Sequence, residues 1–308
     1  MHERATVVLS LACNNECVFC AQEGLTRAGV PVARQLEAAR GSRWGVTFVG
    51  GEPTLDPRLV EHVALARRHG FRAIGVQTNG RLLSQPGYAQ ALAKAGATDV
   101  HLSIHAADAA AHDYHTGRPR SHVEALSGLG AARAAGLVVV VTTVLTRSNF
   151  RSLQGLPRLL ADRGVSAWQI TATMAVGRAE RNVDRVVPPH ALAAPFVLHA
   201  LRASDTLGLR AWVRGLPQSA LGPFARRALP AREAEIDLRD APLAAMFVGM
   251  GPASAPTRPA VPDRERVSLP LAGKVRPAVA EVPAAAPRKS GEALREILPA
   301  LFVKSSGS

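Results

Sequence analysis

The sequence predicts an α/β fold: a partial (β/α)6 TIM-like barrel with parallel strands, followed by a Pro/Ala-rich C-terminal tail. Short β-branched runs alternate with helical stretches between residues 5 and 215, and crossovers of this length join parallel strands. Two of these runs also carry polar residues on one face, which a closed barrel filled with apolar side chains does not accommodate. The composition, with 47% hydrophobic and 20% charged residues, is that of a globular protein and excludes global disorder.

Six strands and six helices are expected in alternation. The strands are predicted at Ala5–Leu11, Gly45–Val49, Ala73–Thr78, Asp99–His105, Leu137–Leu145 and Val165–Thr173, with a further short strand over 209–213. The helices are predicted over 31–40, 57–70, 86–96, 121–135, 149–163 and 189–205.

The faces of two predicted strands indicate what fills the barrel. On the fourth strand His101, Ser103 and His105 share one face, and on the sixth a polar row runs from Gln169 to Thr173. Because outer helices require an apolar outer face, these rows are expected to point inward, into a lumen filled with water or ligand. The alternative is that one strand is misassigned and its polar residues lie at a sheet edge.

Three regions follow from the composition. Residues 1–215 hold the barrel core and residues 216–250 a C-terminal extension of it. Residues 251–308 carry nine of the 22 prolines and are expected to be a flexible tail, because such a segment buries too little apolar surface to offset its ordering entropy. Apolar spacing after a candidate Ser N-cap favours a short helix over 290–302.

The charge and hydropathy of the sequence limit the classes of binding partner that are expected. The formal net charge is +13, but Arg far outnumbers Lys and aromatic residues are only 4%, which argues against nucleic-acid stacking platforms. No apolar run approaches the roughly 18–20 residues needed to cross a bilayer, so no membrane partner is expected. The start, Met1 to Arg4, does not resemble a signal peptide, and a cytoplasmic location is expected.

All three cysteines, Cys13, Cys17 and Cys20, lie within eight residues, directly after the first predicted strand. An odd number of cysteines spaced so closely in the sequence does not form a disulfide framework. It indicates a metal site in a reducing compartment. A cubane iron–sulfur cluster usually takes four cysteines, so three would leave one iron open to another ligand. The alternative is a zinc site, with His2 or a later histidine as the fourth ligand.

A second motif, Gly50-Gly51-Glu52-Pro53, ends the second predicted strand. Paired glycines let a backbone approach a ligand closely, and Pro53 fixes the exit of the strand. Carboxyl ends of parallel strands share one edge of a sheet, where ligands bind in α/β folds. The motif is therefore expected beside the cysteine loop.

Together, C-x3-C-x2-C with Phe19 before its last cysteine and the Gly50–Pro53 motif closely resemble the signatures of radical S-adenosylmethionine (radical SAM) enzymes. The resemblance spans residues 5–215. It implies that Gly50, Gly51, Glu52 and Pro53 bind the amino group of SAM. It also suggests cofactor-binding roles for Phe19, Asn79, Ser103, Thr143 and Ile170.

The resemblance further implies a mechanism. Cys13, Cys17 and Cys20 would hold a 4Fe–4S cluster, which reductively cleaves SAM to a 5′-deoxyadenosyl radical that abstracts hydrogen from a substrate. The implied partners are an electron donor of the flavodoxin or ferredoxin type and a peptide, protein or small-molecule substrate. Without further cysteines the enzyme would carry a single cluster. The alternative is a non-catalytic scaffold that binds a cluster or zinc.

Histidines follow the fourth predicted strand. His105, expected at the lumen mouth, is the candidate catalytic residue, as a substrate contact or proton carrier. The segment from His105 to Gly117 resembles an ordinary loop of the family, and the roles of His101, His112 and His115 stay open. Arginines at 178, 181 and 185 are expected to face the same mouth, either to bind an acidic group or as a solvated basic loop.

Overall fold

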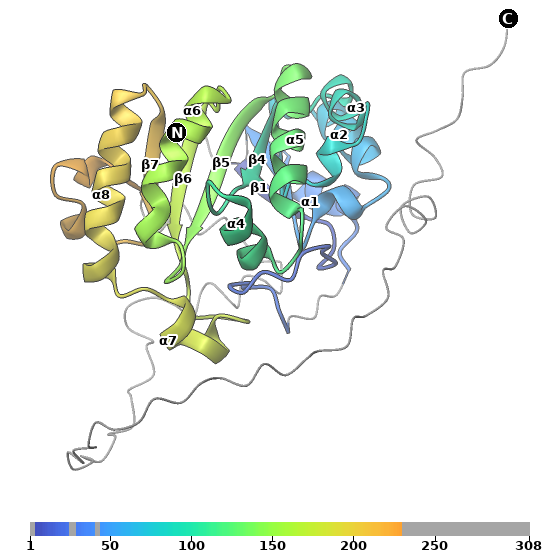
Figure 1. Cartoon of the computed structure of the whole chain (residues 1–308). Helices are drawn as coiled ribbons and strands as arrows, with labels where there is room; N and C mark the ends of the chain where they lie inside the picture. Colours follow the sequence, from blue (N-terminus) through green and yellow to red (C-terminus); the bar gives the residue numbers. More distant parts are fainter. Residues whose placement is uncertain (1–3, 25–28, 41–43, 230–308) are drawn as a thin grey trace, which may run out of the picture. The chain divides into compact units, whose positions relative to one another are not determined.

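The described residues form one parallel sheet of eight strands, and the strands are arranged in the order in which they occur along the chain. The computed structural model describes residues 4–24, 29–40 and 44–229, and all that follows refers to them (Figure 1). The strands are β1 (Arg4–Val8), β2 (Gly45–Val49), β3 (Ala73–Thr78), β4 (Asp99–Ser103), β5 (Val138–Leu145), β6 (Ala167–Ala172), β7 (Arg210–Arg214) and β8 (Ala228–Leu229). The predicted α/β class with parallel strands is confirmed.

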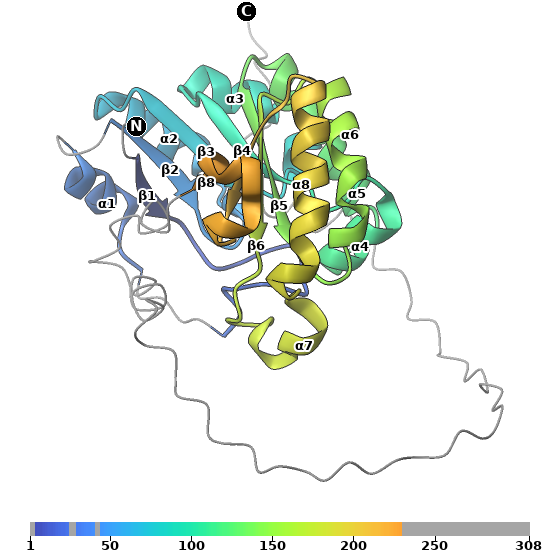
Figure 2. The ribbon, with the colours of Figure 1, turned by 90° about the vertical axis from the view of Figure 1, so that its left-hand side faces the viewer.

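Helices connect the strands and lie along one face of the curved sheet (Figures 1 and 2). They are α1 (Val32–Ala39), α2 (Leu59–Arg68), α3 (Tyr88–Ala95), α4 (Ala109–Thr116), α5 (Ser121–Ala134), α6 (Leu156–Asp162), α7 (Val183–Val186) and α8 (His190–Thr206). No helix among the described residues has the length and apolar character needed to span a membrane. The predicted tail over 251–308, its helix over 290–302 and the part of the extension beyond residue 229 lie outside the described residues.

Burial alternates along the middle strands, most regularly in β5, and separates two faces of the sheet. In β5 every second residue from Val139 to Leu145 is buried, and the residues between them are at least partly exposed. The buried face lies under the helices, and its register neighbours on β4 and β6, such as Leu102 and Trp168, are also fully buried. The other face is the inner one, and the predicted polar rows of β4 and β6 lie on it.

Large apolar side chains form the core between the sheet and the helices. Phe48, Leu102, Ile104 and Trp168 are all fully buried, and each contributes about 1.5–3 kcal/mol relative to an exposed position. The indole of Trp168 donates a hydrogen bond of 2.9 Å to the hydroxyl of Thr143, so its buried N–H is satisfied.

The segment after β4 is a helix, contrary to the loop predicted there. The side chain of Asp108 caps α4 by accepting from the backbone N–H of Ala111 at 2.8 Å, and Gly117 ends it in a left-handed conformation. The apolar periodicity of this histidine-rich stretch is weak, which explains why the helix was missed. The single helix predicted over 149–163 begins as a 3₁₀ segment, and α6 starts beside Pro157.

Candidate active site

The cysteine loop follows β1 and crosses the carboxyl edge of the sheet, in dark blue below α4 in Figure 1. Backbone hydrogen bonds fasten it to the end of α4: the N–H of Glu16 donates to the carbonyl of Thr116 at 2.8 Å, and Val18 donates to His115 at 3.0 Å. On its other side the N–H of Arg178 donates to the carbonyl of Cys20 at 2.9 Å. The loop is therefore held from two distant parts of the chain.

The three cysteines are free thiols with different exposure. Cys13 is exposed, whereas Cys17 and Cys20 are half-buried. Burial, and then the neighbouring charges of Cys13 and Cys20, raises the pKa of Cys17 to about 12. Thiols this close repel one another as thiolates, and a bound cationic centre relieves that repulsion. Among the described residues no three His, Cys, Asp or Glu side chains converge on a single metal-ion position.

Gly50 and Gly51 lie directly against the backbone of the cysteine loop. A β-carbon on Gly50 would sit 2.2 Å from the carbonyl oxygen of Ser10, and one on Gly51 would sit 2.2 Å from that of Ala12. The N–H of Gly51 donates to Ser10 at 2.7 Å and that of Glu52 to Ala12 at 2.8 Å. The sequence predicted that these glycines let the backbone approach a ligand closely. In the structure the backbone of the cysteine loop is what packs closely against them.

Glu52 joins the ends of β2 and β3. Its carboxylate, only 1% exposed, accepts from the hydroxyls of Thr54 and Thr78, both at 2.6 Å, and from the backbone N–H of Asn79, also at 2.6 Å. Burial raises the pKa of Glu52, and these hydrogen bonds act in the opposite direction. Pro53, also buried, begins a short 3₁₀ turn that Glu52 caps. The buried carboxylate therefore links the residues that follow β2 to those at the end of β3.

Asn79 and Arg81 connect the end of β3 to the cysteine loop through hydrogen bonds. The side-chain amide of Asn79 donates to the side chain of Asn14 at 2.6 Å. Arg81 donates to the carbonyl of Asn14 at 2.6 Å and pairs with Glu124 of α5 at 2.5 Å. Sequence reasoning missed Arg81, because an arginine after an Asn-Gly turn carries no signal of its own.

Phe19 packs its ring edge-on against His105, with ring centroids 4.8 Å apart. His105 is only 3% exposed, and its Nδ1 accepts from the backbone N–H of Val144. Burial, together with the nearby His112 and His115, lowers its pKa well below the usual value, so the ring is neutral. The structure does not bring His105 to the lumen, and we do not retain it as the catalytic residue.

His112 and His115 belong to the same packed group. The ring of His112 stacks on that of His105 at 5.5 Å, and its Nδ1 accepts from the backbone N–H of His105 at 3.2 Å. The Nε2 of His115 lies 2.7 Å from the hydroxyl of Thr146. Both rings therefore support the strand end and the cysteine loop.

The remaining candidates divide between the two faces of the sheet. Ser103 lies on the inner face, and among the described residues its hydroxyl makes no hydrogen bond. Thr143 and Ile170 are fully buried on the outer face, where the hydroxyl of Thr143 donates to the carbonyl of Ile104 at 2.5 Å. These two positions do not reach the inner face, so we do not retain them as cofactor contacts.

His101 is the histidine that does face inward. Its side chain is 34% exposed, and its Nε2 lies 3.0 Å from the carboxylate of Asp99. Arg4 donates to the same carboxylate oxygen at 2.7 Å. Gly75, on the neighbouring strand β3, leaves room for the ion pair of Arg4 and Asp99. A β-carbon at Gly75 would lie within 3 Å of both of these side chains. The inner face thus carries a histidine oriented by an ion pair.

Arg178 clasps the cysteine loop from the segment after β6. Its guanidinium donates to the carbonyl of Glu16 at 2.5 Å and to the carboxylate of Glu23 at 2.7 Å, and Arg181 pairs with Glu23 as well. Gly177 makes the approach possible, because a β-carbon there would sit 2.5 Å from the carbonyl of Cys20. Arg185 is exposed and makes no such contact with the described residues.

We expect Arg178→Ala to loosen the cysteine loop. The variant loses both side-chain hydrogen bonds to the loop, and its affinity for a metal centre should fall about tenfold, as for other outer supports of a metal site. Metal content after chelator challenge measures this loss. Arg185→Ala is the matched control, with the same change in charge, and an equal loss in both variants would contradict the role of Arg178.

The sequence of this chain was compared with models of known protein families. Residues 7–156 match the family model described as the radical SAM superfamily. Residues 7–156, just under half of the chain, are therefore similar to this superfamily. Its members use a 4Fe–4S cluster and SAM, and the match includes both motifs from which the resemblance was drawn.

The curated proteins that this chain is similar to carry different names. It is 32% identical over 142 residues to an AdoMet-dependent heme synthase of Nitratidesulfovibrio vulgaris, covering 46% of this chain and 38% of that protein. It is 32% identical over 190 residues to a probable GTP 3′,8-cyclase of Aeropyrum pernix, covering 57% and 52%. The matched part is thus about half or less of these relatives.

A solved structure shares the fold of this chain. SuiB of Streptococcus suis, bound to S-adenosylmethionine, superimposes with a TM-score of 0.58 at 15% identity, over 70% of this chain and 51% of that one. At this identity the likeness supports the partial barrel and nothing further.

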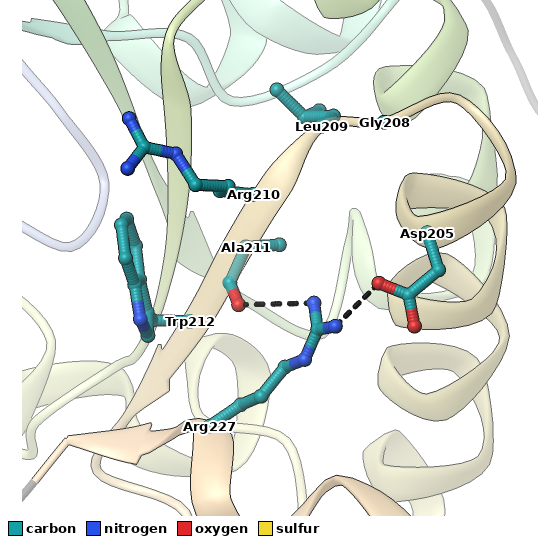
Figure 3. Close-up of a pocket in the computed structure, with 7 residues that line it drawn as sticks. All are labelled: Asp205, Gly208, Leu209, Arg210, Ala211, Trp212 and Arg227. Atoms are coloured by element: carbon teal, nitrogen blue, oxygen red, sulfur yellow. Dashed lines mark hydrogen bonds and ion pairs between the residues drawn. The ribbon is translucent and has the colours of Figure 1, made fainter.

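A pocket of about 290 Å³ lies at the amino edge of the sheet, opposite the edge that holds the cysteine loop (Figure 3). Arg210 and Trp212 line it from the first half of β7, and Arg227 lines it from the segment before β8. Arg227 is held by the carboxylate of Asp205 and the carbonyl of Ala211. Because the cysteine loop lies at the carboxyl edge, this pocket is separate from the candidate site.

Proposed function

We propose that this chain is a single-cluster radical SAM enzyme, which cleaves SAM reductively and uses the product radical to abstract hydrogen from a substrate. One observation carries the proposal. The three-cysteine loop is fixed at the carboxyl edge of a parallel barrel by Gly50, Gly51 and Asn79. The family match covers this loop and its support.

The donor set fits the cluster. Cys13, Cys17 and Cys20 offer three thiolates, the ligands of iron–sulfur clusters, and leave one iron for SAM. When bound, the cluster and SAM supply reductive cleavage and hydrogen abstraction. The role of the chain is positional: Glu52 and Arg81 hold the loop, and Ser103 offers an unengaged hydroxyl on the inner face.

The substrate and partners belong to the proposal as well. Relatives are named for heme synthesis and for GTP cyclisation, and SuiB has been solved with its precursor peptide SuiA. We propose a small metabolite or a peptide side chain as substrate, and a flavodoxin or ferredoxin as electron donor. Three unpaired cysteines suit the reducing cytoplasm, where we place the reaction.

Anaerobic reconstitution of the full chain tests the proposal. The protein is loaded with iron and sulfide, treated with SAM and dithionite, and assayed for 5′-deoxyadenosine. We expect a brown protein with about four irons per chain and formation of 5′-deoxyadenosine. A colourless protein that holds zinc and leaves SAM intact would support the scaffold alternative and overturn the enzyme.

A further inference from the structure

The inner face of β4 carries a carboxylate and an imidazole that are bonded to each other. Asp99 and His101 share this face because they are two residues apart, and the Nε2 of His101 lies 3.0 Å from the Oδ2 of Asp99. β4 ends at Ser103, so His101 lies about 7 Å along the strand from the carboxyl edge of the sheet. The pair is therefore close to the edge that holds the cysteine loop.

Asp99 determines which nitrogen of His101 carries a proton. Its Oδ2 also accepts from Arg4 at 2.7 Å, and its Oδ1 accepts from the hydroxyl of Thr98 at 2.6 Å. Burial raises the pKa of Asp99, but these hydrogen bonds together with that to His101 outweigh it and hold the pKa well below the usual range. An ionised carboxylate only accepts hydrogen bonds, so the Nε2 of His101 is the protonated nitrogen. The neutral ring then has an unprotonated Nδ1.

This second nitrogen of His101 is an open hydrogen-bond acceptor. The side chain is 34% exposed, and its Nδ1 makes no hydrogen bond with any residue that the structure describes. The rings of His105, His112 and His115 are buried, and each has a hydrogen-bond partner. His101 therefore differs from them, because it combines a fixed orientation with an acceptor that a ligand can reach.

The groups around His101 are neutral, and most of them are polar. Gln77 is its register partner on β3 and is exposed, and its amide makes no hydrogen bond within the described part of the chain. Ser103 and its register partner Thr142 on β5 have hydroxyls that are also unengaged by described residues. Val140, beside His101 on β5, is apolar. Several unengaged donors and acceptors therefore lie around one oriented ring.

The charges on strands β1 to β5 cancel when the ring of His101 is neutral. Apart from histidine, these five strands contain two charged side chains, Arg4 and Asp99, which form an ion pair with each other. The next charged residue in the register row of His101 is Arg210, three strands away on β7. An anion or a cation placed at His101 thus meets no free counter-charge on these five strands, whereas a neutral donor satisfies Nδ1.

We propose that the inner face binds a neutral, hydroxyl-bearing substrate, whose hydroxyl donates a hydrogen bond to the Nδ1 of His101. Gln77 bonds to a neighbouring oxygen of the same ligand. The proposal rests on the proposed function and deepens it by naming a substrate class and a residue that recognises it. A site built around a hydrogen bond discriminates strongly against analogues that lack the hydroxyl, because its own polar group is then left unpaired.

Nuclear magnetic resonance of the full, cluster-loaded chain with labelled histidines tests the open nitrogen. His101→Gln identifies the signals of His101 by their loss. At alkaline pH we expect His101 to have a protonated Nε2 and an unprotonated Nδ1, whereas the exposed His190 should show a mixture of both tautomers. The opposite tautomer of His101 would overturn the proposal, because Nδ1 would then be a donor.

Three small probes of matched size test the class of ligand: ethylene glycol, acetate and ethylammonium. At equal concentration we expect ethylene glycol to shift the signals of His101 about threefold more than either ion and to leave those of His190 in place. Gln77→Ala should reduce this shift. Gln169→Ala is the matched control, with the same change on the same face of β6, and it should leave the shift unchanged.

Three results with the probes would contradict the proposal. A larger shift with acetate would indicate an anionic ligand, a larger shift with ethylammonium a cationic one, and no shift with any probe would show that His101 is not a binding residue. An equal reduction in Gln77→Ala and Gln169→Ala would also contradict it.

Addition of SAM separates two sources of the hydroxyl, because SAM carries a ribose of its own. We expect ethylene glycol to shift His101 whether or not SAM is bound. Displacement of the glycol by SAM would assign His101 to the cofactor and overturn the substrate proposal. None of these measurements requires cleavage of SAM, so a failure to form 5′-deoxyadenosine would count against the proposed function and leave this test interpretable.

Discussion

Replacing Cys17 with alanine should abolish the cluster and reduce SAM cleavage to less than about one hundredth of the parent activity. Cys17 is half-buried, and the sequence holds no fourth cysteine to take its place. Iron content and 5′-deoxyadenosine formation measure the two losses. The fold should persist, because the loop is held by backbone hydrogen bonds of Glu16, Val18 and Cys20 rather than by the thiol.

Val18→Ala is the control for Cys17→Ala. It shortens a neighbouring side chain of the same loop and leaves the backbone hydrogen bond to His115 in place. We expect it to keep its iron and its activity. Should Cys17→Ala still produce 5′-deoxyadenosine, the assignment of the three cysteines to the cluster would be wrong.

A single methyl group at Gly51 should have nearly as large an effect. In Gly51→Ala the new β-carbon would sit 2.2 Å from the carbonyl of Ala12 and 2.4 Å from that of Leu11. Both neighbours are backbone atoms of the cysteine loop and cannot rotate away, so the loop must move. We expect loss of the cluster with a destabilisation of about 1–3 kcal/mol. Iron content and the free energy of unfolding report the two effects separately.

Gly130→Ala provides the matched control. Gly130 lies within α5, and nothing approaches its ideal β-carbon within 4 Å. The variant should keep its cluster and gain about 0.5–1 kcal/mol from the better helix former. If Gly51→Ala retained normal iron and activity, the close approach of the two backbones would not be what positions the cysteines.

The parallel strands and the position of the two motifs at strand ends were predictable from the sequence because their signals are local. Alternating β-branched runs predicted the parallel sheet, which is confirmed, and the spacing of Cys13, Cys17 and Cys20 predicted a metal site, which stays a prediction. The support of the loop was not predictable in the same way. Arg81 and Arg178 act through contacts with residues more than 60 positions away, which leave no mark on their own neighbourhoods.

The face of a strand limited what could be predicted about single residues. His105 follows the polar row of β4 by period, but the strand ends at Ser103 and the chain then turns the ring into a buried group with Phe19. Thr143 and Ile170 have the opposite parity to Thr142 and Gln169, which face inward. Parity alone would have excluded both positions, whereas the end of β4 needed the structure.

The contacts of Arg178 with the cysteine loop affect when a metal centre could be bound stably. The guanidinium reaches Glu16 across 162 positions of the chain, and its backbone N–H reaches Cys20. During synthesis the cysteines leave the ribosome long before Arg178 does, so the nascent loop lacks one of its two anchors. We therefore expect durable insertion of an iron–sulfur cluster to follow the synthesis and docking of the segment after β6.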